Sequence, residues 1–267
     1  MDNRPIGVFD SGLGGLTAVR RLQELLPHED IVYFGDTGRV PYGTRSEETI
    51  RRYAREDCQL LLDRDVKFII AACGTVSSVA LDILRSLPVP AIGVVEATAK
   101  AAVSATRNKR IGIIGTAATV RSRSFEKAIL ALDETVFVTA EACPMFVSLV
   151  EAGWIDPADD VAIAMVRRYM APIKAAGVDT LILGCTHFPL LAPTIQAELG
   201  DGVTLIDSGR ETAIHCAAVL AEHNALANNK EGQCRFFVSD RPDGFTRTAE
   251  IFLGRSVSEE VESISLT

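Results

Sequence analysis

The amino-acid sequence predicts an α/β protein made of two pseudo-symmetric parallel-sheet domains, with the active site in the cleft between them. Apolar runs of strand length alternate with segments of helical periodicity, which is typical of parallel sheets whose faces are covered by helices. Similar strand motifs recur at a nearly constant spacing, which indicates an internal repeat. The length of 267 residues and the 48% hydrophobic content are sufficient to fill two such cores.

Apolar runs of strand length predict the strands, and helical periodicity predicts the helices between them. The strands are expected at Ile6 to Phe9, Ile31 to Phe34, Phe68 to Ala72, Ala91 to Val95, Ile111 to Ile114, Val136 to Thr139, Leu181 to Leu183, Val203 to Ile206 and Arg235 to Val238. The clearest helices are expected at Leu16 to Leu26, Glu47 to Leu62, Arg123 to Leu132, Ala158 to Ala176 and Glu211 to His223.

The repeat predicts where the two domains divide. Ile6 to Ser11 resembles Ile111 to Thr116, and Phe68 to Cys73 resembles Thr180 to Cys185. We expect a first domain of residues 1–96 plus 208–267 and a second domain of residues 97–207. The two cysteines would then end equivalent strands, one in each domain. The alternative is that buried parallel strands resemble one another by composition alone.

Charge and hydropathy exclude several classes of partner. A net charge of −8 and a pI near 5.1 argue against a surface that neutralises nucleic-acid phosphates. The N-terminus lacks the pattern of a secretory signal. The most apolar longer stretch, Val89 to Ala105, contains Glu96 and Lys100, so no membrane segment is expected. The prediction is a soluble cytoplasmic protein.

The six cysteines do not form a metal-binding or disulfide pattern, because no two of them make a Cys-x-x-Cys pair. No metal site is predicted, and an isolated cysteine is by default a buried, inert thiol. Cys73 and Cys185 differ from this default because each follows a predicted strand and precedes small or hydroxylated residues. A thiol at a helix N-terminus has its thiolate stabilised by free backbone N–H groups and by the helix dipole.

Two such thiols facing a common cleft suit a reaction in which a proton leaves one face of a carbon and another arrives on the opposite face. Racemisation is such a reaction. Asp10 ends the first strand, His187 lies two residues after Cys185, and Glu151 could hold the histidine in the required protonation state. The alternatives are a turn or cap role for the aspartate and a solvated position for the other two.

Hydroxyl groups in the loops after the strands could bind the carboxylates and amino group of a substrate, although hydroxyls there also cap helices. They belong to Ser11, Tyr42, Thr75, Thr116 and Thr119. The segment from Gly12 to Gly15 lacks the spacing of a dinucleotide-binding motif, but its N–H groups could receive a carboxylate.

Several motifs resemble glutamate racemase, and the resemblance extends over nearly the whole chain. They are Asp10 to Thr17, Gly35-Asp36 followed by Pro41-Tyr42-Gly43, Cys143-Pro144, Val147 to Trp154, Gly184 to Leu190 and Phe252 to Gly254. The resemblance implies interconversion of L- and D-glutamate without pyridoxal phosphate, metal or other cofactor, which supplies D-glutamate for peptidoglycan. It also implies a homodimer.

The resemblance assigns roles to individual residues. It implies that Cys73 and Cys185 are the catalytic acid and base, serving D-glutamate and L-glutamate respectively, and that Asp10, His187 and Glu151 assist them. The glutamate-binding positions implied in this way are Ser11, Pro41, Tyr42, Gly43, Thr75, Thr116, Thr119 and Thr186.

One position departs from the family pattern. The family's first cysteine is typically followed by Asn and then Thr, whereas here Gly74 stands between Cys73 and Thr75. A substrate-binding amide is therefore missing, although the Gly74 backbone N–H remains available. Three alternatives stay open at this point: racemisation of aspartate or another amino acid, a non-catalytic amino-acid-binding protein, and a thiol hydrolase or transferase with one nucleophile.

Overall fold

The computed structural model describes residues 1–257 and 260–265. Its strands are β1 (Ile6–Asp10), β2 (Ile31–Gly35), β3 (Phe68–Ala71), β4 (Ala91–Gly93), β5 (Arg110–Gly115), β6 (Phe137–Ala142), β7 (Thr180–Leu183), β8 (Thr204–Asp207), β9 (Cys234–Val238) and β10 (Val261–Ser263). Its α-helices are α1 (Leu16–Leu25), α2 (Glu47–Leu62), α3 (Gly74–Val79), α4 (Leu81–Arg85), α5 (Val94–Ala105), α6 (Ala117–Ser122), α7 (Ser124–Leu132), α8 (Pro144–Glu151), α9 (Asp160–Ala175), α10 (Ala192–Leu199), α11 (Ser208–Glu222) and α12 (Pro242–Leu253). Short 3₁₀ turns are η1 (Thr37–Arg39), η2 (Tyr42–Thr44) and η3 (Phe188–Leu191).

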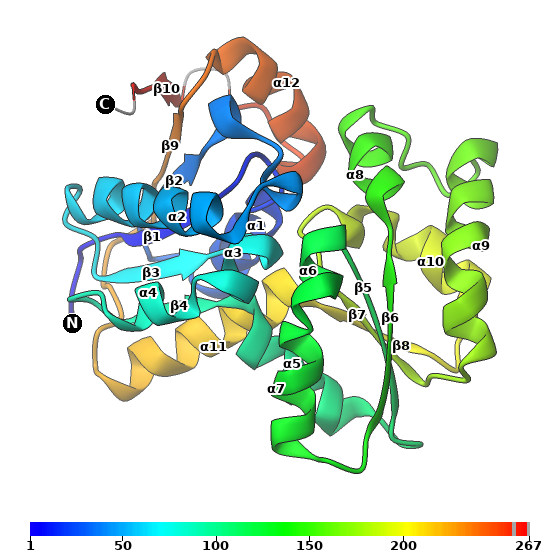
Figure 1. Ribbon diagram of the computed structural model, residues 1–267. Helices are drawn as coiled ribbons and strands as arrows, with labels where there is room; N and C mark the ends of the chain where they lie inside the picture. The colour runs from blue at the N-terminus through cyan, green and yellow to red at the C-terminus, as the bar shows by residue number, and fades with distance from the viewer. Residues whose placement is uncertain (258–259, 266–267) are drawn as a thin grey trace.

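The described strands form two sheets, and every pair of neighbouring strands is parallel. One sheet has the order β10-β9-β2-β1-β3-β4, and the other has the order β6-β5-β7-β8. The order β2-β1-β3-β4 therefore recurs as β6-β5-β7-β8. The two sheets lie in separate halves of the molecule, on the left and right of Figure 1. The predicted fold class of two pseudo-symmetric parallel-sheet halves is confirmed.

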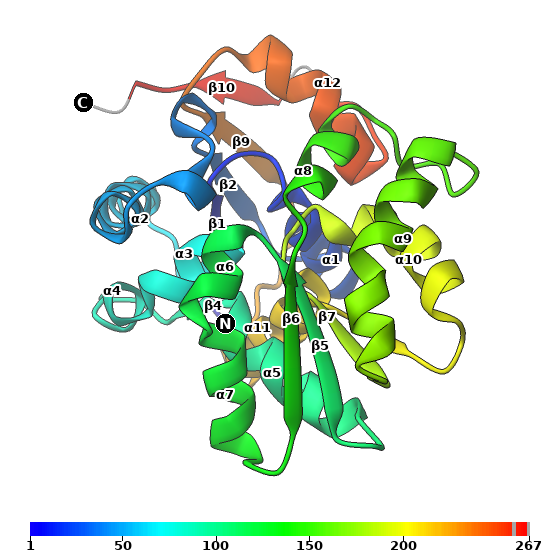
Figure 2. The ribbon, with the colours of Figure 1, turned by 45° about the vertical axis from the view of Figure 1, so that its right-hand side comes forward.

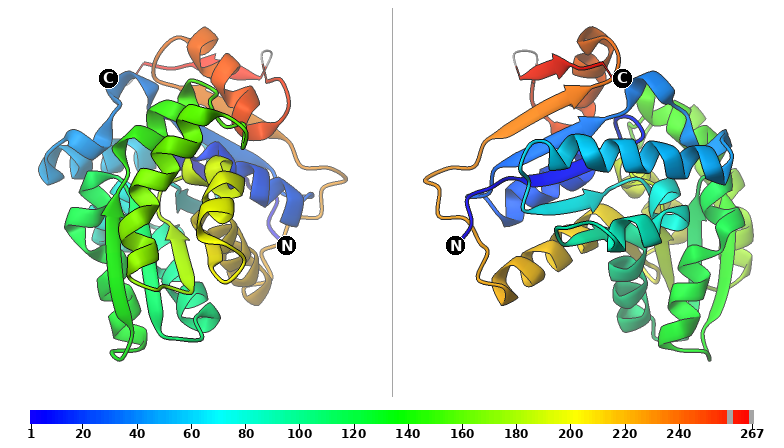
Figure 3. Two further views of the ribbon diagram at one scale, coloured as in Figure 1. Left: turned by 90° about the vertical axis from the view of Figure 1, so that its right-hand side faces the viewer. Right: turned by 60° about the vertical axis from the view of Figure 1, so that its left-hand side comes forward.

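Polar side chains begin several of the helices. Ser46 accepts a hydrogen bond from the backbone N–H of Thr49 at the start of α2. Asp159 accepts from two N–H groups in the first turn of α9, and Asp207 does the same for α11. These side chains satisfy donors that a helix terminus otherwise leaves unpaired. The helices then cover both faces of the sheets, as the views in Figures 2 and 3 show.

The structure differs from the sequence prediction at the fourth strand. We expected a strand through Val95, but β4 ends at Gly93 and α5 begins at Val94. The physical reason is local, because the Val94 N–H donates to the Ser77 hydroxyl at 3.1 Å and the chain turns into a helix there. The predicted division between residues 96 and 97 consequently falls inside α5, and the domain boundaries stay a prediction. The helices α8 and α12 and the strand β10 were not predicted.

The helices α5 and α11 connect the halves, because α5 leads from β4 to β5 and α11 leads from β8 to β9. The helix α11 packs against α1 and against α5, and it lies below the left-hand sheet in Figure 1. One hydrophobic cluster runs from Val19 on α1 through Cys216 on α11 to Leu181 on β7, so the halves share a continuous core. None of the described helices combines the length and the apolar composition that a bilayer crossing requires.

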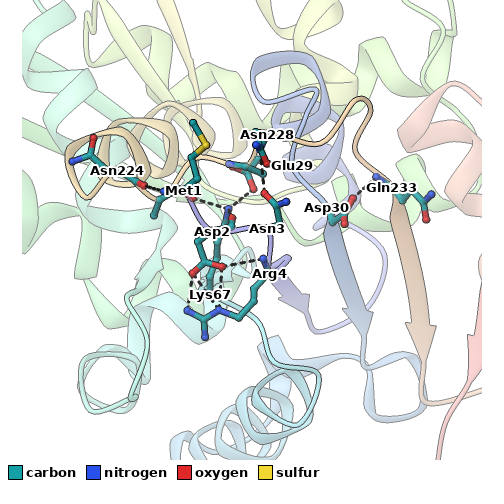
Figure 4. Close-up of polar contacts among 12 residues, drawn as sticks. Met1, Asp2, Asn3, Arg4, Glu29, Asp30, Lys67, Asn224, Asn228 and Gln233 are labelled. Atoms are coloured by element: carbon teal, nitrogen blue, oxygen red, sulfur yellow. Dashed lines mark hydrogen bonds and ion pairs between the residues drawn. The ribbon is translucent and has the colours of Figure 1, made fainter.

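A buried ion pair fastens the segment after α11 to the first half (Figure 4). The Lys67 ammonium lies 2.6 Å from the Glu29 carboxylate, and their side chains are 1% and 2% exposed. Lys67 also donates to the backbone carbonyls of Asp2 and Ala225, and Glu29 accepts from the N–H of Ala227. Each charge is therefore compensated although both are removed from water.

Candidate active site

A cavity of about 440 Å³ lies between the two halves, where the carboxyl ends of their central strands face each other. Ligands collect at this edge of open parallel sheets. All the residues predicted for the site line this one cavity: Asp10, Ser11, Pro41, Tyr42, Gly43, Cys73, Gly74, Thr75, Thr116, Thr119, Glu151, Cys185, Thr186 and His187.

The cavity also includes residues that the sequence analysis did not single out. Val147 and Ser148 lie on α8 and, four and three residues before Glu151, share its face of the helix. Val40 precedes η2 and contributes an apolar wall. The helical spacing before Glu151 is a signal that could have identified the first two.

Cys73 and Cys185 occupy equivalent places in the two halves. Cys73 follows β3, the neighbour of β1, and Cys185 follows β7, the neighbour of β5, after one further residue in each case. Both cysteines are buried, with exposures of 5% and 7%. The helix α3 starts directly after Cys73 as expected, whereas Cys185 is followed by the short 3₁₀ turn η3 rather than by an α-helix.

The two thiols have different surroundings. The Cys73 Sγ lies 3.4 Å from the Ser11 hydroxyl. Burial, followed by the neighbouring Asp10 carboxyl, raises the pKa of Cys73 to about 12. The expectation that the start of a helix favours the thiolate fails for this cysteine, because burial outweighs the N–H groups of Thr75 and Val76 that point at the sulfur. Cys73 is therefore a neutral thiol at pH 7.

Cys185 lies beside a histidine that is held at both ring nitrogens. His187 Nδ1 is 3.9 Å from the Cys185 Sγ, and Nε2 is 3.1 Å from the Glu151 carboxylate. Burial opposes protonation of His187, but the hydrogen bonds to Cys185 and Glu151 outweigh it and raise the pKa of His187 from 6.5 to about 10. His187 is consequently an imidazolium at neutral pH, and it lies beside the Cys185 sulfur.

His187 is also packed from the first half of the molecule. The Phe252 ring on α12 stands nearly perpendicular to the imidazole, with the ring centres 5.2 Å apart. On the glycine-rich loop before α1, a Cβ added at Gly14 would lie 2.6 Å from His187 Nδ1 and 1.9 Å from the Thr186 hydroxyl. Only a residue without a side chain allows the two halves to approach so closely at this point.

Asp10 completes the group around the thiols. Its side chain is fully buried, and its Oδ2 accepts a hydrogen bond from the Gly12 N–H at 3.1 Å. Within the part of the chain that the structure describes, the other oxygen has no hydrogen-bond partner. Burial raises the pKa of Asp10 above its ordinary value, and the charge of His187 partly offsets this. Asp10 itself lines the cavity beside the thiols.

Three threonine hydroxyls also line the cavity, and they link the two halves by hydrogen bonds. Thr75 Oγ1 lies 3.3 Å from Thr116 Oγ1, and the latter lies 3.0 Å from Thr119 Oγ1. The hydroxyl of Tyr42 behaves differently, since it bonds to the buried carboxyls of Asp36 and Asp57. Tyr42 therefore presents its ring and backbone to the cavity, and its hydroxyl is already engaged.

Gly74 lines the cavity at a point where the two halves touch. A Cβ added there would be 2.5 Å from the backbone carbonyl oxygen of Gly184, which belongs to the other half. The absence of a side chain permits this contact. No group of three or more His, Cys, Asp or Glu side chains suited to a metal ion occurs among residues 1–257 and 260–265.

The fold and the site together define a two-domain α/β protein whose cleft is lined by one thiol from each half. The Asp/Glu/Hydantoin racemase family matches residues 7–216. The chain belongs to this family, and its motifs are correctly identified as resembling glutamate racemase.

Individual relatives support this assignment over the full length. Glutamate racemase of Geobacter metallireducens is 45% identical over 265 residues, covering 98% of this chain and 97% of that protein. Glutamate racemase of Neisseria meningitidis serogroup A is 47% identical over 266 residues with the same coverage. The crystal structure of the Bacillus anthracis isoform RacE1 superposes with a TM-score of 0.95 at 38% identity, covering 100% of this chain and 99% of the other.

Two further solved structures resemble this chain to different degrees. Glutamate racemase from Francisella tularensis, solved in complex with D-glutamate, has a TM-score of 0.92 and 36% identity, covering 100% of this chain and 99% of the other. An aspartate racemase homologue from Pyrococcus horikoshii has a TM-score of 0.61 at 15% identity, covering 82% of this chain and 99% of the other, and this likeness shows the fold alone.

Proposed function

We propose that the protein interconverts L- and D-glutamate without a cofactor, by proton transfer between the substrate α-carbon and two opposed thiols. The observation that carries the proposal is that Cys73 and Cys185 end equivalent strands and line one cavity between the halves. Glutamate is favoured over aspartate because the relatives that match at 45–47% identity over nearly the full chain are named glutamate racemases.

The proposed reaction begins with one thiolate and one thiol. Cys185 is proposed as the base because the His187 imidazolium lies beside its sulfur, while Cys73 is the neutral acid. Cys185 removes the α-proton from one face of the substrate, and the resulting carbanion receives a proton from Cys73 on the other face. The roles reverse for the opposite enantiomer, which by the family resemblance is D-glutamate.

The remaining residues are proposed to bind and orient the substrate. The Cys73 thiol must ionise for the reverse reaction, and a substrate ammonium placed beside the sulfur would lower the cost of that ionisation. Asp10 lines the same cavity, and its carboxyl is proposed to interact with this ammonium. The hydroxyls of Thr75, Thr116 and Thr119 are placed to donate to the substrate carboxylates.

We infer a cytoplasmic homodimer that supplies D-glutamate for peptidoglycan, and we infer the domain division at residues 96/97 and 207/208. These inferences rest on the family resemblance and on the internal repeat. Light scattering of the purified protein tests the dimer, and a monomeric mass at micromolar concentration would contradict it.

The activity is tested by incubating purified protein, without added pyridoxal phosphate or metal, with each enantiomer of glutamate and of aspartate. Chiral chromatography then measures the opposite enantiomer. We expect conversion of both glutamate enantiomers to a racemic mixture and at least tenfold lower kcat/KM for aspartate. Binding of glutamate without conversion would contradict the proposal and indicate a non-catalytic amino-acid-binding protein.

A further inference from the structure

Two buried carboxyl groups lie behind the cavity wall that Tyr42 forms. Asp36 follows β2 and Asp57 lies on α2, and both side chains are 0% exposed. The Tyr42 hydroxyl bonds to Oδ2 of Asp36 and lies 3.0 Å from Oδ2 of Asp57. The Arg39 guanidinium joins the same two carboxyls, through Nε to Asp36 and through Nη2 to Asp57. Neither carboxyl lines the cavity.

The hydrogen atoms in this cluster do not suffice for two ionised carboxylates. The Tyr42 hydroxyl carries one proton and can donate to only one of the two carboxyl oxygens that contact it. If Asp36 and Asp57 were both charged, one carboxylate oxygen would face a phenol oxygen with no proton between them, away from water. One additional proton removes the conflict, because the second carboxyl can then donate to the phenol oxygen.

The partners of the two carboxyls decide which of them carries the proton. Asp36 accepts three hydrogen bonds, from Tyr42, from Arg39 and from the Ser239 hydroxyl at 2.7 Å. Hydrogen bonds to a carboxylate favour its charged form. Among the residues that the structure describes, Asp57 accepts only from Arg39 if the Tyr42 proton is committed to Asp36. The additional proton therefore belongs on Oδ2 of Asp57.

We propose that Asp57 is a neutral acid at neutral pH and acts as a positioning residue, which fixes Tyr42 through a directed chain from Asp57 to Tyr42 to Asp36. The chain holds the tyrosine hydroxyl away from the cavity and fixes the segment from Pro41 to Thr44 as a wall of the site. The part of this inference that concerns substrate rests on the proposed racemase function.

The electrostatic surroundings of Asp57 agree with the hydrogen-bond geometry. Burial raises the pKa of Asp57 well above its ordinary value, the charge of Asp36 adds to the rise, and Arg39 partly opposes it. Burial also raises the pKa of Tyr42, so the phenol keeps its proton. The titratable and charged groups that face Asp57 are Asp36 and Arg39 after β2, Tyr42 on η2, and Glu56 and Cys58 on its own helix.

A proton bound only in the folded state makes stability depend on pH. Above pH 5 an aspartate in the unfolded chain is ionised, since its ordinary pKa is 3.8. Folding would then take up one proton at Asp57, and stability would fall as the pH rises. The equilibrium constant of unfolding of the wild type should therefore increase tenfold per pH unit relative to that of Asp57→Asn between pH 5 and 7.

Asparagine is the matched substitution because it can accept from Arg39 with its oxygen and donate to Tyr42 with its amide, as the neutral acid does. Urea denaturation at pH 5, 6 and 7 measures the two equilibrium constants. Asp63→Asn, which changes an exposed aspartate just after the same helix, is expected to parallel the wild type. Parallel pH dependences of the wild type and Asp57→Asn would overturn the neutral-acid assignment, whether or not the protein is a racemase.

A kinetic measurement tests the positioning role separately. Asp57→Ala removes the donor to Tyr42 and is expected to raise KM for glutamate several-fold with a smaller change in kcat, whereas Asp57→Asn should keep KM within about twofold of wild type. Circular dichroism establishes that both variants are folded at the assay temperature. Equal KM values for Asp57→Ala and the wild type would overturn the positioning role, and failure of the wild type to racemise glutamate would instead count against the proposed function.

Discussion

Replacement of Gly14 by alanine tests how the halves position the histidine of the site. The added Cβ would lie 1.9 Å from the Thr186 hydroxyl and 2.6 Å from His187 Nδ1, whereas ordinary contact begins at 3.4 Å. Thr186 must therefore retreat by about 1.5 Å and His187 by about 0.8 Å, and a misplacement of about 1 Å in an active site can cost about a hundredfold in rate. We expect Gly14→Ala to lower kcat/KM at least about a hundredfold and to cost about 1–3 kcal/mol of stability through overpacking.

The assay follows racemisation of L-glutamate by chiral chromatography, with urea denaturation of the same preparations. Gly202→Ala is the matched control, since a Cβ added at that position meets nothing within 4 Å. Its kcat/KM should equal that of the wild type. If Gly14→Ala retained kcat/KM within twofold of the wild type, the close approach of the glycine loop would not position His187, and the reasoning would be refuted.

Three further predictions concern the core and the histidine. Lys67→Met should lower the free energy of unfolding by about 3–5 kcal/mol, because it leaves the buried Glu29 carboxylate without its cation. Lys174→Met breaks an exposed ion pair and should cost less than about 1 kcal/mol in the same urea titration, so equal losses would contradict the prediction. The pKa of His187 is raised to about 10, so its protonated form should stabilise the folded wild type relative to His187→Asn. This difference in the free energy of unfolding should be complete below pH 6.5 and should disappear as the pH rises through 10. A difference that does not vary with pH would contradict the prediction. Phe252→Leu removes an aromatic contact worth about 0.5–1.5 kcal/mol and should lower kcat/KM about twofold to tenfold with an altered pH profile, whereas an unchanged profile would mean that Phe252 only fills space.

The sequence predicted the features that follow from strand order. In a parallel sheet the carboxyl ends of the strands meet at one edge, so the residues after β1, β3, β5 and β7 could be expected to collect there. Cys73 and Cys185 do lie on a common cavity together with His187 and Glu151. The spacing of the repeated motifs was sufficient for this inference because the repeat fixes equivalent positions in both sheets.

The features that escaped prediction depend on how the halves pack together. Gly14 contacts Thr186 across the cleft, and Phe252 reaches His187 from the C-terminal part of the chain, so sequence spacing contains no signal for either contact. The hydroxyl of Tyr42 was expected to face a substrate, but buried carboxyls that are distant in the sequence bind it instead. The protonation of Cys73 also required the structure, because burial and a helix terminus act in opposite directions.

The central claim, that two opposed thiols exchange protons with one carbon, is tested most directly by the position of isotope label. Wild type, Cys73→Ala and Cys185→Ala are incubated with L-glutamate in deuterated water, and the α-deuterium content of each enantiomer is measured early in the reaction. The two-thiol mechanism predicts that wild type places deuterium in D-glutamate but not in the remaining L-glutamate, and that neither variant racemises. Racemisation by either alanine variant, or equal labelling of both enantiomers from the start, would contradict it.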